Sequence, residues 1–214
     1  TGNYNVAMGK GAMGSTTTAE SNVAIGNNAL YSNVEGSRST ALGYEALFTQ
    51  NPVGTVNMEN VAVGFNSGKS INTGTRNTLI GSNAGDALTT GHYNVALGYH
   101  ALSLENTGGT NTAIGYESLY TLNTSDAYNV AVGFQSGRGM NTGAYNALVG
   151  ATSGSSLTSG SRSIAIGYAS LGSATTGEYN TAIGFEAMYS NVDGDNNTAI
   201  GYRALRTMDP VGNV

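Results

Sequence analysis

The sequence has no cysteine and no tryptophan, and only two prolines and two histidines among its 214 residues. The absence of cysteine excludes disulfide bonds, thiol catalysis and zinc–thiolate sites. Lysine and arginine number eight against 13 acidic residues, a net charge of −5, so we expect no surface for nucleic acid. Because no run of 18 apolar residues occurs, we also expect no direct membrane insertion of this segment.

Glycine, in contrast, is abundant, and twelve glycines close copies of one short motif. One copy runs from Asn111 through Ala113 and Ile114 to Gly115, and another from Asn180 through Ala182 and Ile183 to Gly184. The motif glycines stand 17 residues apart, except for one interval of 21 and one of 18. They are Gly9, Gly26, Gly43, Gly64, Gly81, Gly98, Gly115, Gly133, Gly150, Gly167, Gly184 and Gly201.

A short fixed period along the whole chain predicts a solenoid, a rod of stacked coils, in place of a globular domain. We therefore predict one repeat array over residues 1–214. The first residues, Thr1 to Tyr4, match the end of a coil, and Gly212 to Val214 match the start of one. We expect the chain to be a fragment of a longer fibre.

Each motif predicts one short strand, because positions −3 to −1 before the glycine (position 0) are β-branched or small apolar residues. Alternation places positions −3 and −1 on one face and positions −4, −2 and 0 on the other. We expect the Ile, Val and Leu face to fill the coil. The Ala and Gly face would then be covered by neighbouring chains, since strands apolar on both faces are normally covered on both.

The rest of each coil is expected to contain a second short strand and a Thr-Gly turn, as at Gly74 and Gly91, where glycine would supply a positive φ. Asparagine at position −4 predicts a hydrogen-bonded ladder, with a row of ligand-binding amides as the alternative. A large apolar residue at position +4 predicts a core column. In four copies glycine replaces it and a bulky residue follows three places later: Ile71, Leu88, Met140 and Leu157. Extra residues at 50–58 predict a surface loop.

Aligned in this register, the chain resembles the head repeats of trimeric autotransporter adhesins of the YadA type, through copies such as 22–26, 60–64 and 129–133. The longer unit 180–191 is also similar to repeats of phage and viral tail fibres. The resemblance implies an all-β, left-handed parallel β-roll of about twelve 17-residue coils that forms a homotrimer. It implies an extracellular adhesive fibre, on a cell or virion surface, whose partners are host glycans or matrix proteins.

No grouping of residues predicts catalysis, a metal site or a cofactor. His92 and His100 are expected to be exposed in loops. Glu45, Glu117 and Glu186 recur at one position of the coil, but in coils about 20 Å or more apart, too far for the paired carboxylates of a glycosidase. Two alternatives remain. A tailspike-type enzyme that degrades polysaccharide would need clustered acids, and an ice-binding solenoid would need an unbroken row of threonine.

Aromatic residues favour two positions. At position +1 we expect the rings to cap the ends of the core and to stack between coils. At position −5, beside the polar turns, we predict an exposed tyrosine ladder that binds a sugar or a protein partner. The predicted binding residues are Tyr93, Tyr128, Tyr145 and Tyr179.

Overall fold

The computed structural model describes residues 2–125 and 127–207. Thr1, Asp126 and the expected start of a further copy at 212–214 lie outside this part. Within the described residues, all helices or strands present are three-residue strands: β1 (Val6–Met8), β2 (Val23–Ile25), β3 (Thr40–Leu42), β4 (Val61–Val63), β5 (Thr78–Ile80), β6 (Val95–Leu97), β7 (Thr112–Ile114), β8 (Val130–Val132), β9 (Ala147–Val149), β10 (Ile164–Ile166), β11 (Thr181–Ile183) and β12 (Thr198–Ile200).

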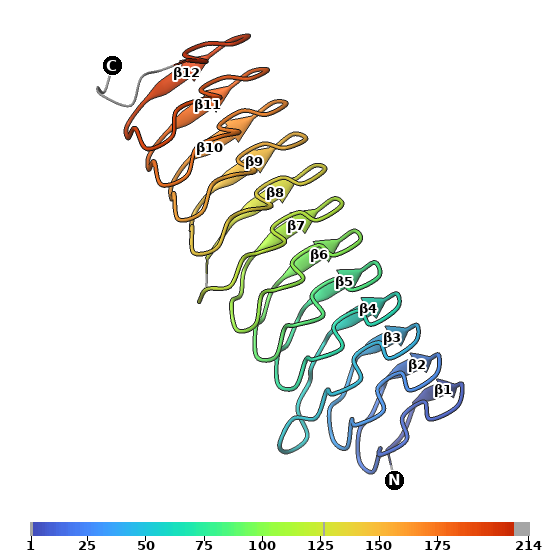
Figure 1. Cartoon of the computed structure of the whole chain (residues 1–214). Helices are drawn as coiled ribbons and strands as arrows, with labels where there is room; N and C mark the ends of the chain where they lie inside the picture. The colour runs from blue at the N-terminus through green and yellow to red at the C-terminus, as the bar shows by residue number, and fades with distance from the viewer. Residues whose placement is uncertain (1, 126, 208–214) are drawn as a thin grey trace.

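The strands form one parallel sheet in sequence order, which confirms the predicted β-solenoid. Each strand pairs with the next at the same position of the motif, as where Ala96 lies opposite Ala113 and Leu97 opposite Ile114. Figure 1 shows the result as a rod in which the strands are successive rungs, with β1 and β12 at opposite ends. The 17-residue period of the sequence is therefore the step of the rod.

Each coil contains one strand, and the expected second strand is wrong for the described residues. Turns follow the strand along positions +1 to +6, which we call the return segment (residues 116–121 in the coil of β7). The non-glycine residues with positive φ, between 48° and 63°, fall at positions −5, +2 and +4 of the coil. Repeated left-handed residues bend the chain too tightly for a second ladder of extended backbone.

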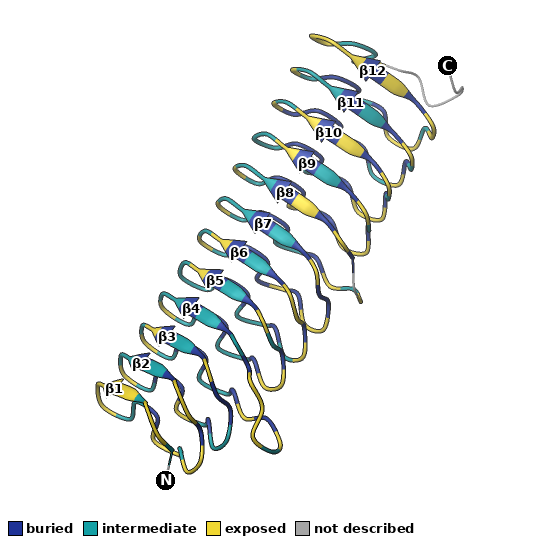
Figure 2. Ribbon diagram, turned by 180° about the vertical axis from the view of Figure 1, so that it is seen from behind, coloured by how far each residue is buried: buried dark blue, intermediate teal, exposed yellow. Residues whose placement is uncertain are grey.

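The sheet faces the opposite way to our expectation. The middle residue of each strand from β2 onward is buried, and Ala24, Ala96, Ala113 and Ala182 have no exposed surface. The flanking residues at positions −3 and −1, including Ile114 and Ile183, are half-buried or exposed. Figure 2 shows this as strands in teal and yellow. Alanine therefore fills the coil, and the bulky aliphatic side chains point outward.

Alanine faces inward because the strand and the return segment lie very close together. At position +3 the hydroxyl groups of Ser118, Ser136 and Ser153 donate to strand carbonyls of the next coil at 3.0 Å. A backbone within reach of one serine side chain leaves little room between the layers, so a side chain larger than alanine fits only against glycine at position +4, as Leu79 and Leu148 do.

Leucine and methionine at position +4 fill the wider part of the core, as Leu30, Leu102 and Leu119 do. Where glycine replaces them, Ile71, Leu88, Met140 and Leu157 are fully buried as predicted. Leu79 and Leu148 replace the usual alanine in β5 and β9, and they fill the rest of the space that the glycines at position +4 leave. A Cβ atom on Gly85 would come within 2.9 Å of Leu79, and one on Gly137 within 2.9 Å of Leu148.

The asparagine ladder is confirmed. The Oδ1 atom of an asparagine accepts the backbone N–H of the equivalent residue in the next coil, and Asn94 Oδ1 thus accepts from the Asn111 N–H at 3.0 Å. Asn180 likewise accepts from Asn197 at 3.0 Å. Between Ser39 and Asn60 the ladder passes through Gln50, whose Oε1 accepts from both side chains at 3.2 and 3.0 Å. These amides hold the coils together and are buried.

Glycines have two different roles. At position 0, Gly115 has φ 136° and Gly184 has φ 137°, and a Cβ atom on either would overlap the carbonyl oxygen of the next motif glycine. The prediction that glycine supplies a positive φ in the Thr-Gly turns is wrong, because Gly74 and Gly91 do not have positive φ. Glycine is needed at Gly74 and Gly91 because the next coil's carbonyl occupies the place of a Cβ atom.

The long unit forms the predicted loop, which projects from the rod beside β3 and β4 (Figure 1). Val53 is 96% exposed at its tip, whereas Met58 returns to the buried core. A parallel bridge between Ser37 and Asn57 fixes the point where the loop rejoins the coil. The insertion thus leaves the stacking of the coils intact.

Candidate functional site

The exposed face of the sheet is the most extensive candidate surface. Positions −3 and −1 form two parallel columns of aliphatic residues and threonine along all twelve strands. Leu97 is 44% exposed, Val130 41% and Ile166 40%. An apolar surface of this extent is typical of an interface, because monomeric proteins seldom leave one open to water.

An aromatic ladder borders this face at position +1, where we had expected the rings to cap the core. The rings do stack between coils, but they are 40–69% exposed, so the capping role is wrong. Ring centroids lie 5.4 Å apart from Tyr99 to Tyr116 and 5.3 Å apart from Tyr116 to Phe134. Two further stacks join Tyr44 to Phe65, and Tyr168 to Phe185 and Tyr202.

The predicted tyrosine column at position −5 is exposed. Tyr93, Tyr128, Tyr145 and Tyr179 are 48–54% exposed. Tyr128 and Tyr145 stack at 5.3 Å, and the guanidinium of Arg162 lies between Tyr145 and Tyr179, 5.6 and 5.3 Å from their ring centroids. Tyr128, Tyr145, Arg162 and Tyr179 thus make a continuous column of planar groups.

Tyr93 stands apart from the other three tyrosines. Thr110 occupies position −5 of the intervening coil, so no ring joins Tyr93 to Tyr128. Its hydroxyl accepts a hydrogen bond from Arg76 at 2.8 Å, and the same guanidinium lies 5.4 Å from its ring centroid. The four predicted binding residues therefore fall into two separate groups on one edge of the rod.

The three recurring glutamates at position +2 are ion-paired. Glu45 contacts Lys69 at 2.7 Å, Glu117 contacts Arg138 at 2.6 Å, and Glu186 contacts both Arg203 and Arg206. Hydrogen bonds from Lys69, Arg138 and Arg206 hold the pKa of the three carboxyl groups below the usual range. These carboxylates join neighbouring coils.

His92 is exposed as expected, but His100 is half-buried. Its ring lies 3.0 Å from the Ser103 hydroxyl and packs edge-on against Tyr99 and Tyr120. In the described residues, no three His, Asp or Glu side chains are grouped as a metal site would require. No helix in the same part of the chain has the length and apolar character needed to cross a membrane.

One buried acid, Glu105, was not among the predicted functional residues. It has no exposed surface, and its carboxylate accepts backbone N–H groups from Gly108 at 2.8 Å and Asn106 at 3.0 Å. Burial raises its pKa. The register of the repeat could have revealed it, since the same position holds Leu88 and Leu122 in the adjacent coils.

Comparison with known proteins gives no family. No protein-family model matches the chain, and neither a curated protein nor a solved structure is similar to it.

Proposed function

We propose that this chain is a non-enzymatic segment of an extracellular fibre on a cell or virion surface. Three copies associate through their exposed sheet faces, and the trimer presents a repeated surface that attaches to host glycans or matrix proteins. The observation that carries the proposal is the pair of outward aliphatic columns that run the length of the rod.

A second copy of the same chain suits these columns better than an unrelated protein. The columns repeat once per coil, so a partner can match every step only if it has the same rise and register. Identical chains satisfy this condition, and most soluble oligomers are assembled from them. The threefold symmetry and the left-handed winding rest on the resemblance to autotransporter heads.

The charged residues favour a structural role over polysaccharide cleavage. Each glutamate at position +2 is neutralised by a cation of the next coil. A general acid of a glycosidase needs a raised pKa, whereas the pKa values of Glu45, Glu117 and Glu186 are lowered.

The attachment role is tested by screening the segment against immobilised glycans and matrix proteins. Replacing Tyr93, Tyr128 and Tyr145 with alanine should weaken binding at least tenfold, because a multivalent surface loses several contacts at once. The matched control replaces Tyr31 and Tyr120, which lie on the return segment. Equal binding by the two variants would reject the position −5 column, and an absence of any ligand would reject attachment.

A further inference from the structure

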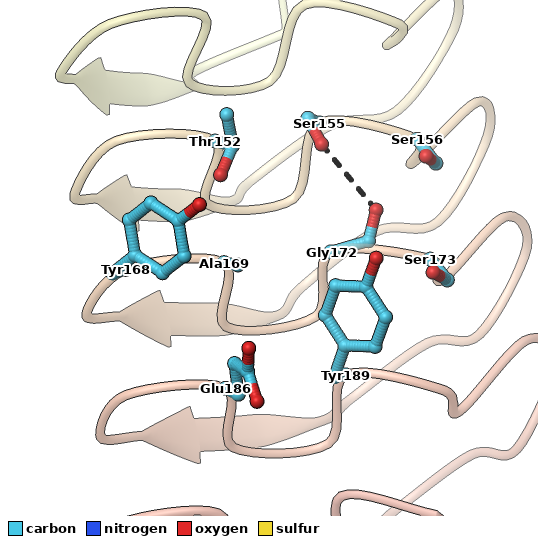
Figure 3. A pocket seen from close by; sticks show the side chains of 9 residues that line it. All are labelled: Thr152, Ser155, Ser156, Tyr168, Ala169, Gly172, Ser173, Glu186 and Tyr189. Carbon is cyan, nitrogen blue, oxygen red and sulfur yellow. Dashed lines mark hydrogen bonds between the residues drawn. The ribbon is translucent and has the colours of Figure 1, made fainter.

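A hollow of about 320 Å³ opens on the return segments of the coils that contain β9, β10 and β11. Tyr168 stands on one side and Tyr189 on the other, with Ala169 and Gly172 between them (Figure 3). Thr152 and Ser155 border it from the coil of β9, and Glu186 from the coil of β11.

The hollow exists because two adjacent coils carry small residues where several other coils carry large ones. Position +5 is Ser155 and Gly172 here, but Phe48, Tyr120 and Arg138 in other coils. Gly172 also makes room for its neighbour, since a Cβ atom there would lie 2.9 Å from the Tyr189 ring. The hydroxyl of Ser155 donates to the Gly172 carbonyl at 3.3 Å and braces the rim.

We propose that this hollow binds a neutral sugar ring. The proposal rests on the attachment function above and names its ligand class. Tyrosine rings offer flat apolar surfaces to the C–H faces of a pyranose, while serine and threonine hydroxyls and one carboxylate can hydrogen-bond its hydroxyl groups. A volume near the lower end of the usual range for ligand sites, about 300–1,000 Å³, suits one or two rings.

The hollow lacks the cation that an anionic ligand would need among its lining residues. Its lining contains the Glu186 carboxylate and no lysine or arginine. Arg203 and Arg206 both bind Glu186 Oε2, at 2.9 and 2.5 Å, which fixes the orientation of the carboxylate. A phosphate, a sulfate or a sialic acid would find no lysine or arginine among the lining residues, whereas a sugar hydroxyl can donate to the Glu186 carboxylate.

The hollow stays open when the sheet face is covered. Strand and return segment pack against each other across the core, so their outward side chains point away from each other. Sister chains on the sheet face would therefore leave positions +2 to +6 accessible to ligand, and these supply every lining residue except Tyr168.

The test is a titration of the segment, in its native oligomeric state, with glucose, galactose, mannose, N-acetylglucosamine and sialic acid. Saturation-transfer NMR and calorimetry should show millimolar binding of at least one neutral sugar, and weaker or no binding of sialic acid. Ser155→Phe should lower this affinity at least tenfold by filling the hollow, since Phe48 already occupies the equivalent position in β3's coil. Tyr189→Ala should lower it similarly.

Tyr31→Ala is the control, because Tyr31 holds the same position as Tyr189 in the coil of β2. It should bind sugar like the unaltered chain, and all variants should keep the circular dichroism spectrum and the oligomer mass. No sugar binding, or equal binding by Ser155→Phe, would overturn the proposal. Because oligomer mass is measured separately, failure here is distinguishable from failure of the fibre proposal.

Discussion

At the scale of single residues, backbone conformation explains the invariant glycine of the motif. Gly115 combines φ 136° with a neighbouring carbonyl where its Cβ atom would lie. Gly54, at the projecting loop, also has positive φ, at 82°, but nothing lies within 4 Å of a Cβ atom placed there. A comparison of substitutions at these two glycines therefore distinguishes the cost of backbone strain from the cost of steric overlap.

We expect Gly115→Ala to lower the free energy of unfolding by more than 3 kcal/mol, because about 1–3 kcal/mol of backbone strain adds to a clash with the next coil. Gly54→Ala should cost about 1 kcal/mol, from strain alone. Chemical denaturation of both variants measures the difference. Equal losses would show that close stacking at position 0 does not explain the motif.

Glu105 gives stability a pH dependence of unusual sign. Its folded pKa is raised by burial, so folding favours the protonated carboxyl. This contribution is complete below the ordinary glutamate pKa of about 4.3 and is lost as pH rises through the raised folded pKa. The ion-paired Glu117, whose pKa is lowered, has the opposite sign and loses its contribution as the medium becomes acidic.

Glu105→Gln should therefore stabilise the chain at pH 7, where the buried charge is costly, and have little effect near pH 4. The amide oxygen can still accept the N–H groups of Asn106 and Gly108. Glu117→Gln is the control and should destabilise slightly at pH 7 only. Denaturation curves across this pH range would contradict the account if the Glu105 difference did not grow with pH.

At the scale of one coil, a leucine in the strand is accompanied by glycine at position +4 of its own and the preceding coil, whereas in the other coils alanine in the strand is accompanied by leucine or methionine there. Leu148 in β9 lies over Gly137 and Gly154, in the space that a leucine at position +4 fills elsewhere. Leu79 in β5 does the same over Gly68 and Gly85. The exchange keeps the rod at one thickness while its sequence alternates.

A double-mutant cycle tests this exchange. Leu148→Ala should cost about 2–5 kcal/mol by opening a cavity, and Gly137→Leu about 1–3 kcal/mol by overpacking. The double variant should cost clearly less than the two losses added together, because each change supplies what the other removes. Simple additivity in denaturation experiments would show that the two sites do not share a space.

The sequence was sufficient to place the strands, the asparagine ladder and the core residues Ile71 and Met140, because repetition fixes their register. It could not orient the sheet, since both faces of each strand are apolar. The decision depends on the narrow gap spanned by the Ser136 hydroxyl, which admits a side chain larger than alanine only where position +4 is glycine, as at Leu148. That gap is created by residues with left-handed backbone conformation, such as Glu117 and Leu119. Neither residue type favours this conformation, so the sequence did not predict it.

The candidate site was partly predictable in the same sense. Exposure of Tyr128 and Tyr145 followed from their place beside polar turns, whereas the part played by Arg162 in their column required the stacking of coils. The hollow between Tyr168 and Tyr189 depends on what neighbouring coils lack, so no single motif indicated it.

At the scale of the whole molecule, the rod buries its thin core but leaves a long apolar sheet face exposed to solvent. Burial of apolar surface contributes about 25 cal/mol per Å², so covering this face would favour the association proposed above. Substitution of Ile114 by lysine places a charge in the middle of the face and should disrupt association. Leu104→Lys, at an exposed leucine of the return segment, should leave association unchanged.

The mass of the particle in solution, measured by light scattering, tests this account most directly. We predict three times the chain mass of 21.7 kDa for the unaltered chain and for Leu104→Lys, and a smaller mass for Ile114→Lys. A stable particle with the mass of one chain would contradict the proposal that copies of this protein cover one another's sheet face.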